Sequence, residues 1–348
     1  MRIAHVVWGM KTGGVETMLV NIINEQVKTE QVRLFIVNDF IDEFVVGKLS
    51  PKCKVVRINR QPKKKDYLKI LKLNLKLLAF RPQIVHIHSR NISKLLLGKW
   101  KMVRTIHNPN NVSYEYPKMK ALYAISDIVR DVTIKQGFPN VITIYNGIST
   151  SNFKTREGSA PSNGIYKIVQ VSRLRISHKG QDILLNALSL LYSQGIKNFV
   201  LYLIGEGESE QELRQMTVDL GLTNHINFEG VKTQEHLYQH LCDYDVFVQP
   251  SRYEGFGLTV AEAMAAKLPV IVSNIQGPME VIDNGKYGMS FKSEDVEDLA
   301  DKLKTVLQGG YDYSLIDKAY NHIREYYDVA TTAQRYLEEY RKLLKHES

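Results

Sequence analysis

Cysteine is nearly absent from this sequence, and several other features are missing with it. Only Cys53 and Cys242 occur in 348 residues, so a disulfide framework is excluded, and no Cys/His spacing resembles a metal site. No apolar run approaches the roughly 20 residues needed to span a bilayer. The first apolar run, Met1–Trp8, is too short for a secretory signal. We therefore expect a protein of the cytoplasm, free or peripheral on the inner face of the cell membrane.

The charge of the chain is divided unevenly between its halves. The net charge is +9, but residues 1–150 hold 25 Lys/Arg against 10 Asp/Glu, whereas residues 151–348 hold 21 against 27. A basic half attracts an anionic partner. No nucleic-acid recognition motif occurs, and the aromatic residues do not alternate with basic ones as stacking platforms would. We expect no nucleic-acid partner, and favour an anionic membrane surface bound through the basic N-terminal half.

Part of this positive charge lies in the segment 63–80, which is expected to be helical. Four lysines with helical spacing share one face: Lys65, Lys69, Lys72 and Lys76. Four leucines line another face, which we expect to pack on a sheet: Leu68, Leu71, Leu75 and Leu78. A second basic and apolar segment follows at 93–102. Attraction to anionic lipid headgroups is one interpretation, and an ordinary solvated face is the other.

Strand-like apolar runs alternate with amphipathic segments of helical length, which is typical of α/β layers on parallel sheets. The expected strands are 3–8, 33–37, 55–58, 84–87, 103–106 and 141–144, then 167–171, 199–204, 226–228, 246–249 and 270–272. A polar segment rich in Ser, Pro and Gly separates the two series at 154–164. We predict one domain at 1–153 and a second at 164–329. A final helix at about 330–348 is expected to pack back onto the first.

The most informative segment is Gln249–Met264, where a strand, a glycine turn and a helix follow one another. Gly255 and Gly257 let the backbone approach a ligand closely, and the helix expected to begin near Leu258 offers free amides to an anion. Glu262 lies in an apolar, Ala/Met-rich helix, where a carboxylate needs partners; the two hydroxyls of a ribose would supply them. Glu254 would then lie nearer the sugar. The alternative is a solvent-facing Glu254 and a salt-bridged Glu262.

With Glu254 and Glu262 in a Glu-x7-Glu pattern, the sequence resembles family 4 of the retaining glycosyltransferases, whose GT-B fold has two facing Rossmann-like domains with a cleft between them. Other landmarks of that family occur in the same order along nearly the whole chain. They are Thr12-Gly13-Gly14-Val15-Glu16-Thr17, Ile144–Ile148, Val171–Leu174 with Lys179-Gly180, Leu203–Gly207 and Gly277–Ile282.

The resemblance implies a hexosyltransferase that moves a sugar from a nucleotide-sugar, with a UDP-sugar favoured, to a lipid-linked or polysaccharide acceptor in bacterial surface polysaccharide (exopolysaccharide or capsule) synthesis. It implies that Arg173 and Lys179 contact the diphosphate, where fixed cations stabilise the charge of the leaving group, so that neither a metal nor another cofactor is required. The donor would also contact Gly14 and the four residues Gly255, Phe256, Gly257 and Leu258. His107 would help to position the reacting sugar. Asn108 stands where the family frequently has Asp, which weakens any role that needs a carboxylate there.

Two alternatives to this function stay open: a non-catalytic nucleotide-binding module, and a sugar-nucleotide epimerase or phosphorylase of similar fold. A dehydrogenase is disfavoured because the full Gly-x-Gly-x-x-Gly fingerprint is absent. Asp243-Tyr244-Asp245 is expected to be structural rather than a metal-binding Asp-x-Asp. We expect His86 and His88 to point to opposite faces of a strand and to be structural, with acceptor contact by His88 as the alternative.

Overall fold

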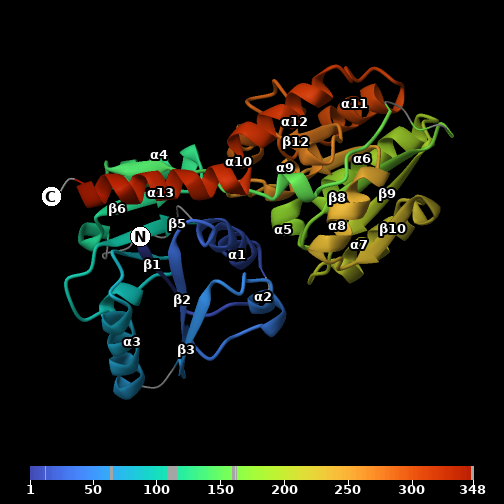
Figure 1. Ribbon diagram of the computed structural model, residues 1–348. Helices are drawn as coiled ribbons and strands as arrows, with labels where there is room; N and C mark the ends of the chain where they lie inside the picture. Colours follow the sequence, from blue (N-terminus) through green and yellow to red (C-terminus); the bar gives the residue numbers. More distant parts are fainter. Residues whose placement is uncertain (12, 63–65, 108–115, 159–160, 162, 346–348) are drawn as a thin grey trace. The chain divides into compact units, whose positions relative to one another are not determined.

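The computed structural model describes residues 1–348 except 12, 63–65, 108–115, 159–160, 162 and 346–348. Lys65 and Asn108, as well as Thr12 of the glycine loop, therefore lie outside the described residues. The chain divides into two compact units (Figure 1). The first unit comprises Met1–Ile148 and Tyr326–Ser348, and the second comprises Ser149–Glu325.

A seven-stranded parallel sheet forms the centre of the first unit, in the order β3-β2-β1-β4-β5-β6-β7. Its strands are β1 Arg2–Val7, β2 Gln31–Asn38, β3 Lys54–Arg60, β4 Ile84–Ile87, β5 Met102–Ile106, β6 Ala121–Ala124 and β7 Val141–Thr143. Its helices are α1 Gly14–Gln26, α2 Glu43–Gly47, α3 Tyr67–Phe80, α4 Asp127–Lys135 and α13 Val329–Lys345. Helices follow β1, β2, β3 and β6, as the sequence pattern predicted, whereas only short 3-10 turns are described after β4 and β5.

The sheet of the first unit is buried on both faces. Along β1, Ile3 and Val7 belong to one apolar cluster, whereas Ala4 and Val6 belong to another. Successive side chains of a strand point to opposite faces, so each cluster occupies one side of the sheet. A parallel sheet covered on both faces explains why β1 is a continuous apolar run rather than an alternating one.

The first unit is completed by α13, which packs against α1. Tyr336 and Tyr340 of this helix are fully buried in the cluster that also contains Ile3 and Val7. The returning chain is fastened at Ile148, which pairs with Asp328 in an isolated parallel bridge. The C-terminal helix is therefore part of the core of this unit.

The predicted packing of the helix α3 is wrong. Leu73, Leu77 and Phe80 face the sheet, whereas the four leucines expected there are exposed: Leu68, Leu71, Leu75 and Leu78. Both sets have helical spacing, so the periodicity alone did not distinguish the buried face from the exposed face.

Among the described helices, none combines the length and the apolar character that crossing a membrane requires.

The second unit contains a six-stranded parallel sheet in the order β10-β9-β8-β11-β12-β13. The strands are β8 Tyr166–Val171, β9 Phe199–Ile204, β10 Ile226–Gly230, β11 Val246–Gln249, β12 Val270–Ser273 and β13 Met289–Phe291. The helices are α5 Ile176–Lys179, α6 Gln181–Ser193, α7 Glu210–Asp219, α8 Gln234–His240, α9 Leu258–Ala265, α10 Gln276–Val281, α11 Val296–Leu307 and α12 Leu315–Tyr326. Its six strands repeat the order of the first six strands of the first sheet, 3-2-1-4-5-6, which is that of a Rossmann fold. The expectation of two parallel-sheet α/β domains is confirmed.

Candidate functional site

Lys179 and Glu254 form an ion pair at the carboxyl end of the second sheet. Lys179 ends the short helix α5, and Glu254 lies in the loop between β11 and α9. The Lys179 Nζ donates to Glu254 Oε2, and both side chains are partly buried. Gln249 Nε2 donates to the same carboxylate oxygen at 3.2 Å. The sequence singled out both charged residues, and the structure brings them together.

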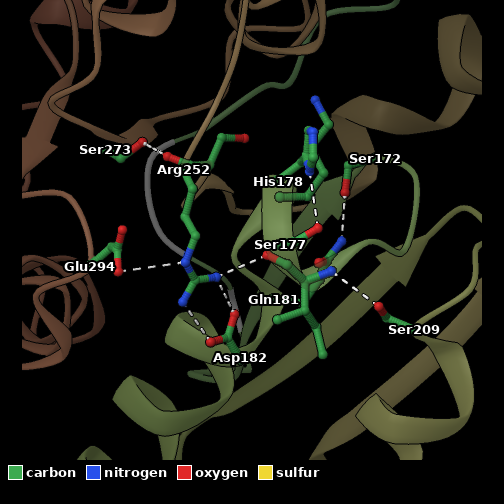
Figure 2. Close-up of polar contacts among 12 residues, drawn as sticks. Ser172, Ser177, His178, Gln181, Asp182, Ser209, Arg252, Ser273 and Glu294 are labelled. Atoms are coloured by element: carbon green, nitrogen blue, oxygen red, sulfur yellow. Dashed lines mark hydrogen bonds and ion pairs between the residues drawn. The ribbon is translucent and has the colours of Figure 1, made fainter.

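The two loops that carry this pair are joined by Arg252 (Figure 2). Its guanidinium makes a two-pronged ion pair with Asp182, at 2.7 and 2.8 Å, and donates to the Ile176 carbonyl at 2.9 Å. The Arg252 amide donates to the His178 carbonyl at 2.9 Å. Glu294 lies 3.7 Å from the guanidinium. Sequence reasoning missed this residue because its partners lie about 70 positions away in the chain.

Glu262 lies on α9 and is held by one described partner, Gln234, whose Nε2 donates to Glu262 Oε1 at 2.9 Å. Burial raises the pKa of the Glu262 carboxyl to about 7, and the hydrogen bond from Gln234 opposes this shift. Among the described residues Glu262 has no salt bridge, because Gln234 is neutral, so the salt-bridged alternative is not seen there. The remaining lone pairs of the carboxylate can accept further donors.

The start of α9 has the backbone that an anion site needs. Gly257 caps the helix with φ +110°, a conformation open to glycine and rare for other residues. The helix begins at Leu258, and the amides of Val260 and Ala261 donate to the Gly257 carbonyl. The first amides of a helix have no partner within it and can bind an anion. Thr259, in the first turn, donates to Gln249 Oε1 at 3.3 Å. Gln249 thus connects α9 to Glu254.

A pocket of about 790 Å³ lies beside this site, at the carboxyl ends of β8 and β9. Arg173, Glu208, Lys232 and Thr259 contribute polar groups to its wall. Arg173 is 71% exposed, and its Nε lies 3.4 Å from Glu208. Ligands of open α/β sheets bind at the carboxyl ends of the strands, where the strand order reverses. Here that reversal lies between β8 and β11, whose following loops carry Arg173 and Glu254.

Gly205, in the wall of the pocket, allows two backbone segments to approach each other closely. A Cβ at this position would lie 2.0 Å from the Ser172 carbonyl oxygen, and φ is +137°. The backbones after β8 and β9 therefore approach each other more closely than any side chain allows. The segment Leu203–Gly207 is a weak motif by itself, but the structure requires glycine at Gly205 and Gly207 because backbone atoms leave no space for a Cβ there.

His107 and Gly14 belong to the first unit. Gly14 begins α1, and His107 follows β5. Both ring nitrogens of His107 are buried and have no hydrogen-bond partner among the described residues. Burial, with the Arg104 charge in second place, lowers the pKa of His107 to about 4. A neutral imidazole with unsatisfied nitrogens is chemically suited to meet a ligand.

Three other histidines gather in the core of the first unit, and the expectation that His86 and His88 face opposite ways is wrong. Their ring centroids are 4.0 Å apart, because residues two apart in a strand share a face. His5 Nδ1 lies 2.9 Å from His88 Nε2. His5 Nε2 is hydrogen-bonded to Gln26 Oε1, and His86 Nδ1 is hydrogen-bonded to the Tyr340 hydroxyl. Nitrogens of the three histidines lie within 4.8 Å of one another, a possible ligand set that chain spacing concealed.

Most nitrogens of this histidine cluster already have partners, since His86 Nε2 also bonds to Thr105 Oγ1 at 2.8 Å. The cluster is thus a hydrogen-bonded network.

Asp243 and Asp245 of the Asp-x-Asp segment also make structural contacts. Asp245 pairs with Arg156 and accepts from the Lys167 amide at 2.7 Å, whereas Asp243 pairs with His240.

Comparison with known proteins connects this geometry to a family. Residues 152–326 match the family model of glycosyl transferases group 1, and residues 12–152 match that of glycosyltransferase family 4. A GDP-mannose-dependent alpha-(1-6)-phosphatidylinositol monomannoside mannosyltransferase of Mycobacterium tuberculosis is 32% identical over 40% of this chain and 38% of its own length. An amylovoran biosynthesis glycosyltransferase of Erwinia amylovora is 29% identical over 57% of this chain and 51% of its own. The matched regions thus span between about a third and a half of these relatives.

Solved structures share the fold. A glycosyltransferase of Rickettsia africae superposes with a TM-score of 0.83 at 22% identity, covering 99% of this chain and 98% of its own. A protein of Anabaena in complex with UDP and glucose gives 0.77 at 21% identity, covering 97% and 99%. The fold class is therefore GT-B, and the chain belongs to the glycosyl transferases group 1, a family of sugar-transferring enzymes.

Proposed function

We propose that this protein is a hexosyltransferase that moves a sugar from a nucleotide-sugar, with a UDP-sugar favoured, to a lipid-linked or polysaccharide acceptor of a bacterial surface glycan. The observation that carries the proposal is the Lys179–Glu254 ion pair beside the pocket of Arg173. It joins a cation and a carboxylate at the carboxyl ends of the strands of a parallel sheet, where ligands of such sheets bind. The UDP of the Anabaena complex and the amylovoran of the Erwinia relative support the choice of donor and acceptor.

Each site residue has a role in this proposal. Glu262 accepts the ribose hydroxyls, and the amides from Gly255 to Leu258 face the donor. Arg173 and Lys179 stabilise the diphosphate as its bond to the sugar breaks. Glu254 keeps Lys179 in place and lies nearest the sugar. Gly14 and His107 of the first unit are assigned to the donor phosphates and the reacting sugar.

The transfer is proposed to retain the anomeric configuration. The acceptor oxygen forms its bond to the anomeric carbon on the face from which the diphosphate leaves. The bond from that carbon to the diphosphate oxygen breaks, and the leaving phosphate takes the proton of the acceptor hydroxyl. Attack and departure on one face leave the configuration unchanged.

Turnover of a donor panel tests the assignment. UDP-, GDP- and dTDP-sugars are incubated with wild type and Glu254→Gln, and slow donor hydrolysis is measured. Glu254→Gln should reduce turnover by about 10²–10³-fold, as loss of an electrostatic group at a reacting centre does, with nucleotide affinity nearly unchanged. Glu297→Gln, an exposed carboxylate on α11, is the matched control.

Three outcomes would count against parts of the proposal. UDP binding without turnover of any donor, even with lipid-linked acceptor extracts, would indicate a non-catalytic nucleotide-binding module. An inverted anomer in the first product would exclude retention. Loss of activity in EDTA, restored by a divalent cation, would show that Arg173 and Lys179 do not suffice without a metal.

A further inference from the structure

The helix α3 has a second apolar face on its outer side. Leu68, Leu71, Leu75 and Leu78 are 79%, 49%, 55% and 54% exposed, and Tyr67 at the helix start is 71% exposed. The helix lies beside β3, the edge strand of the first sheet (Figure 1). Scattered exposed leucines are ordinary on a protein surface, but four on one helix form a contiguous apolar strip, which marks an interaction site.

Lysines border this leucine strip. At 3.6 residues per turn, Lys69, Lys72 and Lys76 lie between the leucines and the buried face of the helix. Lys72 and Lys76 are exposed, and Lys69 is half-buried. The helix Tyr67–Phe80 contains no acidic residue. Residues 51–100 hold 14 Lys/Arg and a single acidic residue, Asp66. The segment that contains the strip is therefore strongly basic.

A neighbouring segment extends the same character. The Leu97 amide donates to Asn74 Oδ1 of α3 at 2.6 Å, and Asn74 Nδ2 donates to the Leu95 carbonyl at 2.9 Å. Leu97 is 59% exposed. Lys94 and Lys99 on either side of it are exposed as well. Two segments, each apolar with lysines, are thus held next to each other.

We propose that α3 lies in the surface of an anionic lipid bilayer, with the leucine strip among the acyl chains and the lysines at the headgroups. A helix with one apolar face and a lysine-rich border has the composition of interfacial helices, and each lysine gains attraction to anionic lipid. A second copy of this chain fits less well, because it would bring identical lysines together. This docking site is separate from the donor site and does not depend on the proposed reaction.

The test is cosedimentation of the full chain with vesicles of phosphatidylcholine, with and without phosphatidylglycerol, at low and high salt. Leu71→Gln/Leu75→Gln should lower the partition coefficient at least about tenfold at both salt concentrations, since burial of leucine side chains is not screened by salt. Lys69→Gln/Lys72→Gln/Lys76→Gln should lower it chiefly at low salt. Gln is a good helix former, so α3 is preserved.

Val218→Gln is the matched control: it removes a side chain that is 58% exposed on α7 of the second unit, and binding should remain at the wild-type value. The proposal is overturned if the leucine variant binds vesicles like wild type, or if wild type binds phosphatidylcholine with and without phosphatidylglycerol equally. A dimer that the leucine variant dissociates, without change in vesicle binding, would assign the strip to a second copy instead. Slow donor hydrolysis without vesicles should be the same in the leucine variant and wild type, which separates this proposal from the proposed reaction.

Discussion

Glu262 is a carboxyl group whose protonation and ligand binding are coupled. Its pKa of about 7 arises from burial, with Gln234 as a donor. Near neutral pH the free protein therefore holds this group in both protonation states. Ribose hydroxyls donate hydrogen bonds, so they bind the charged form preferentially. Nucleotide binding below pH 7 should release a proton from this site.

The affinity for UDP should consequently fall as the pH is lowered from 7, by up to about tenfold per pH unit. Glu262→Gln should bind UDP more weakly and without this pH dependence. Calorimetric titration at pH 6, in two buffers of different ionisation enthalpy, measures the released proton directly. Equal apparent enthalpies for wild type in the two buffers would refute the coupling, and Glu297→Gln again serves as the control.

The same carboxyl should also make the stability of the protein depend on pH. A higher pH favours nucleotide binding but lowers the free energy of unfolding. Because its pKa is raised on folding, the native state binds the proton more tightly, and the free energy of unfolding falls as the pH rises from about 4.5 to 7. Between pH 5 and pH 8 this amounts to about 2 kcal/mol. Glu262→Gln lacks the effect. Without nucleotide it should therefore gain stability relative to wild type at the higher pH, as chemical denaturation at both pH values would show.

At the scale of elements, the site depends on the junction of two loops. The loop containing α5 supplies Lys179, and the loop between β11 and α9 supplies Glu254. Arg252 and Asp182 fasten one loop to the other without touching the pocket residues themselves. The junction is thus a positioning device in the proposed reaction.

Arg252→Lys should uncouple the loops, because an ammonium cannot replace the two-pronged guanidinium contact. We expect kcat to fall about tenfold or more, as small displacements of reacting groups do, whereas UDP affinity stays within about threefold. Asp182→Asn should give the same fall, and the double variant no further fall. Arg214→Lys, at an exposed ion pair on α7, is the control. A lowered melting temperature with unchanged kcat would mean that the junction is only structural.

The sequence predicted those elements whose information is local. The strand, glycine turn and helix at 246–265 were predicted from consecutive residues, and the structure has β11 and α9 at these positions. The short strands β6 and β13 were missed because they contain no β-branched residue, whereas the equally short β4 and β7 are rich in Val and Ile. The buried face of α3 was assigned wrongly, since Leu73 and Leu77 repeat at helical spacing just as the exposed leucines do. Arg252 with Asp182, like His5 with His88, meets its partner only through the fold.

At the scale of the whole molecule, the two units differ in their sensitivity to acid. Burial lowers the pKa of His5 and His107 to about 4 and that of His86 and His88 well below 6.5. The unfolded chain takes up protons at these groups below pH 6.5, whereas the native state does not. Stability is therefore fully present above pH 6.5 and is lost as the pH falls below it. All four groups lie in the first unit.

The first unit should therefore be the acid-labile one. At pH 5.5 His5 and His107, whose pKa values are lowered to about 4, each cost about 1 kcal/mol relative to pH 7.5. His86 and His88 shift the stability in the same direction. Trp8 and Trp100, the two tryptophans of the chain, both lie in the first unit, so their fluorescence reports its unfolding. The unfolding midpoint of the first unit, followed by tryptophan fluorescence, should fall on acidification more than that of the second unit, followed by circular dichroism without nucleotide. A tryptophan transition that does not move between pH 7.5 and 5.5 would refute this account.

The bridge between Ile148 and Asp328 has a consequence for biosynthesis. The ribosome makes Ser149–Glu325 before it makes α13, whose Tyr336 and Tyr340 fill the core of the first unit. The second unit is continuous and can fold as it emerges, whereas the first lacks, until α13 is made, part of the apolar cluster that covers one face of its sheet. Multidomain chains generally fold from the N-terminus onward. In this chain we expect the first unit to be completed after the second, and the nascent first unit to be where chaperones bind longest.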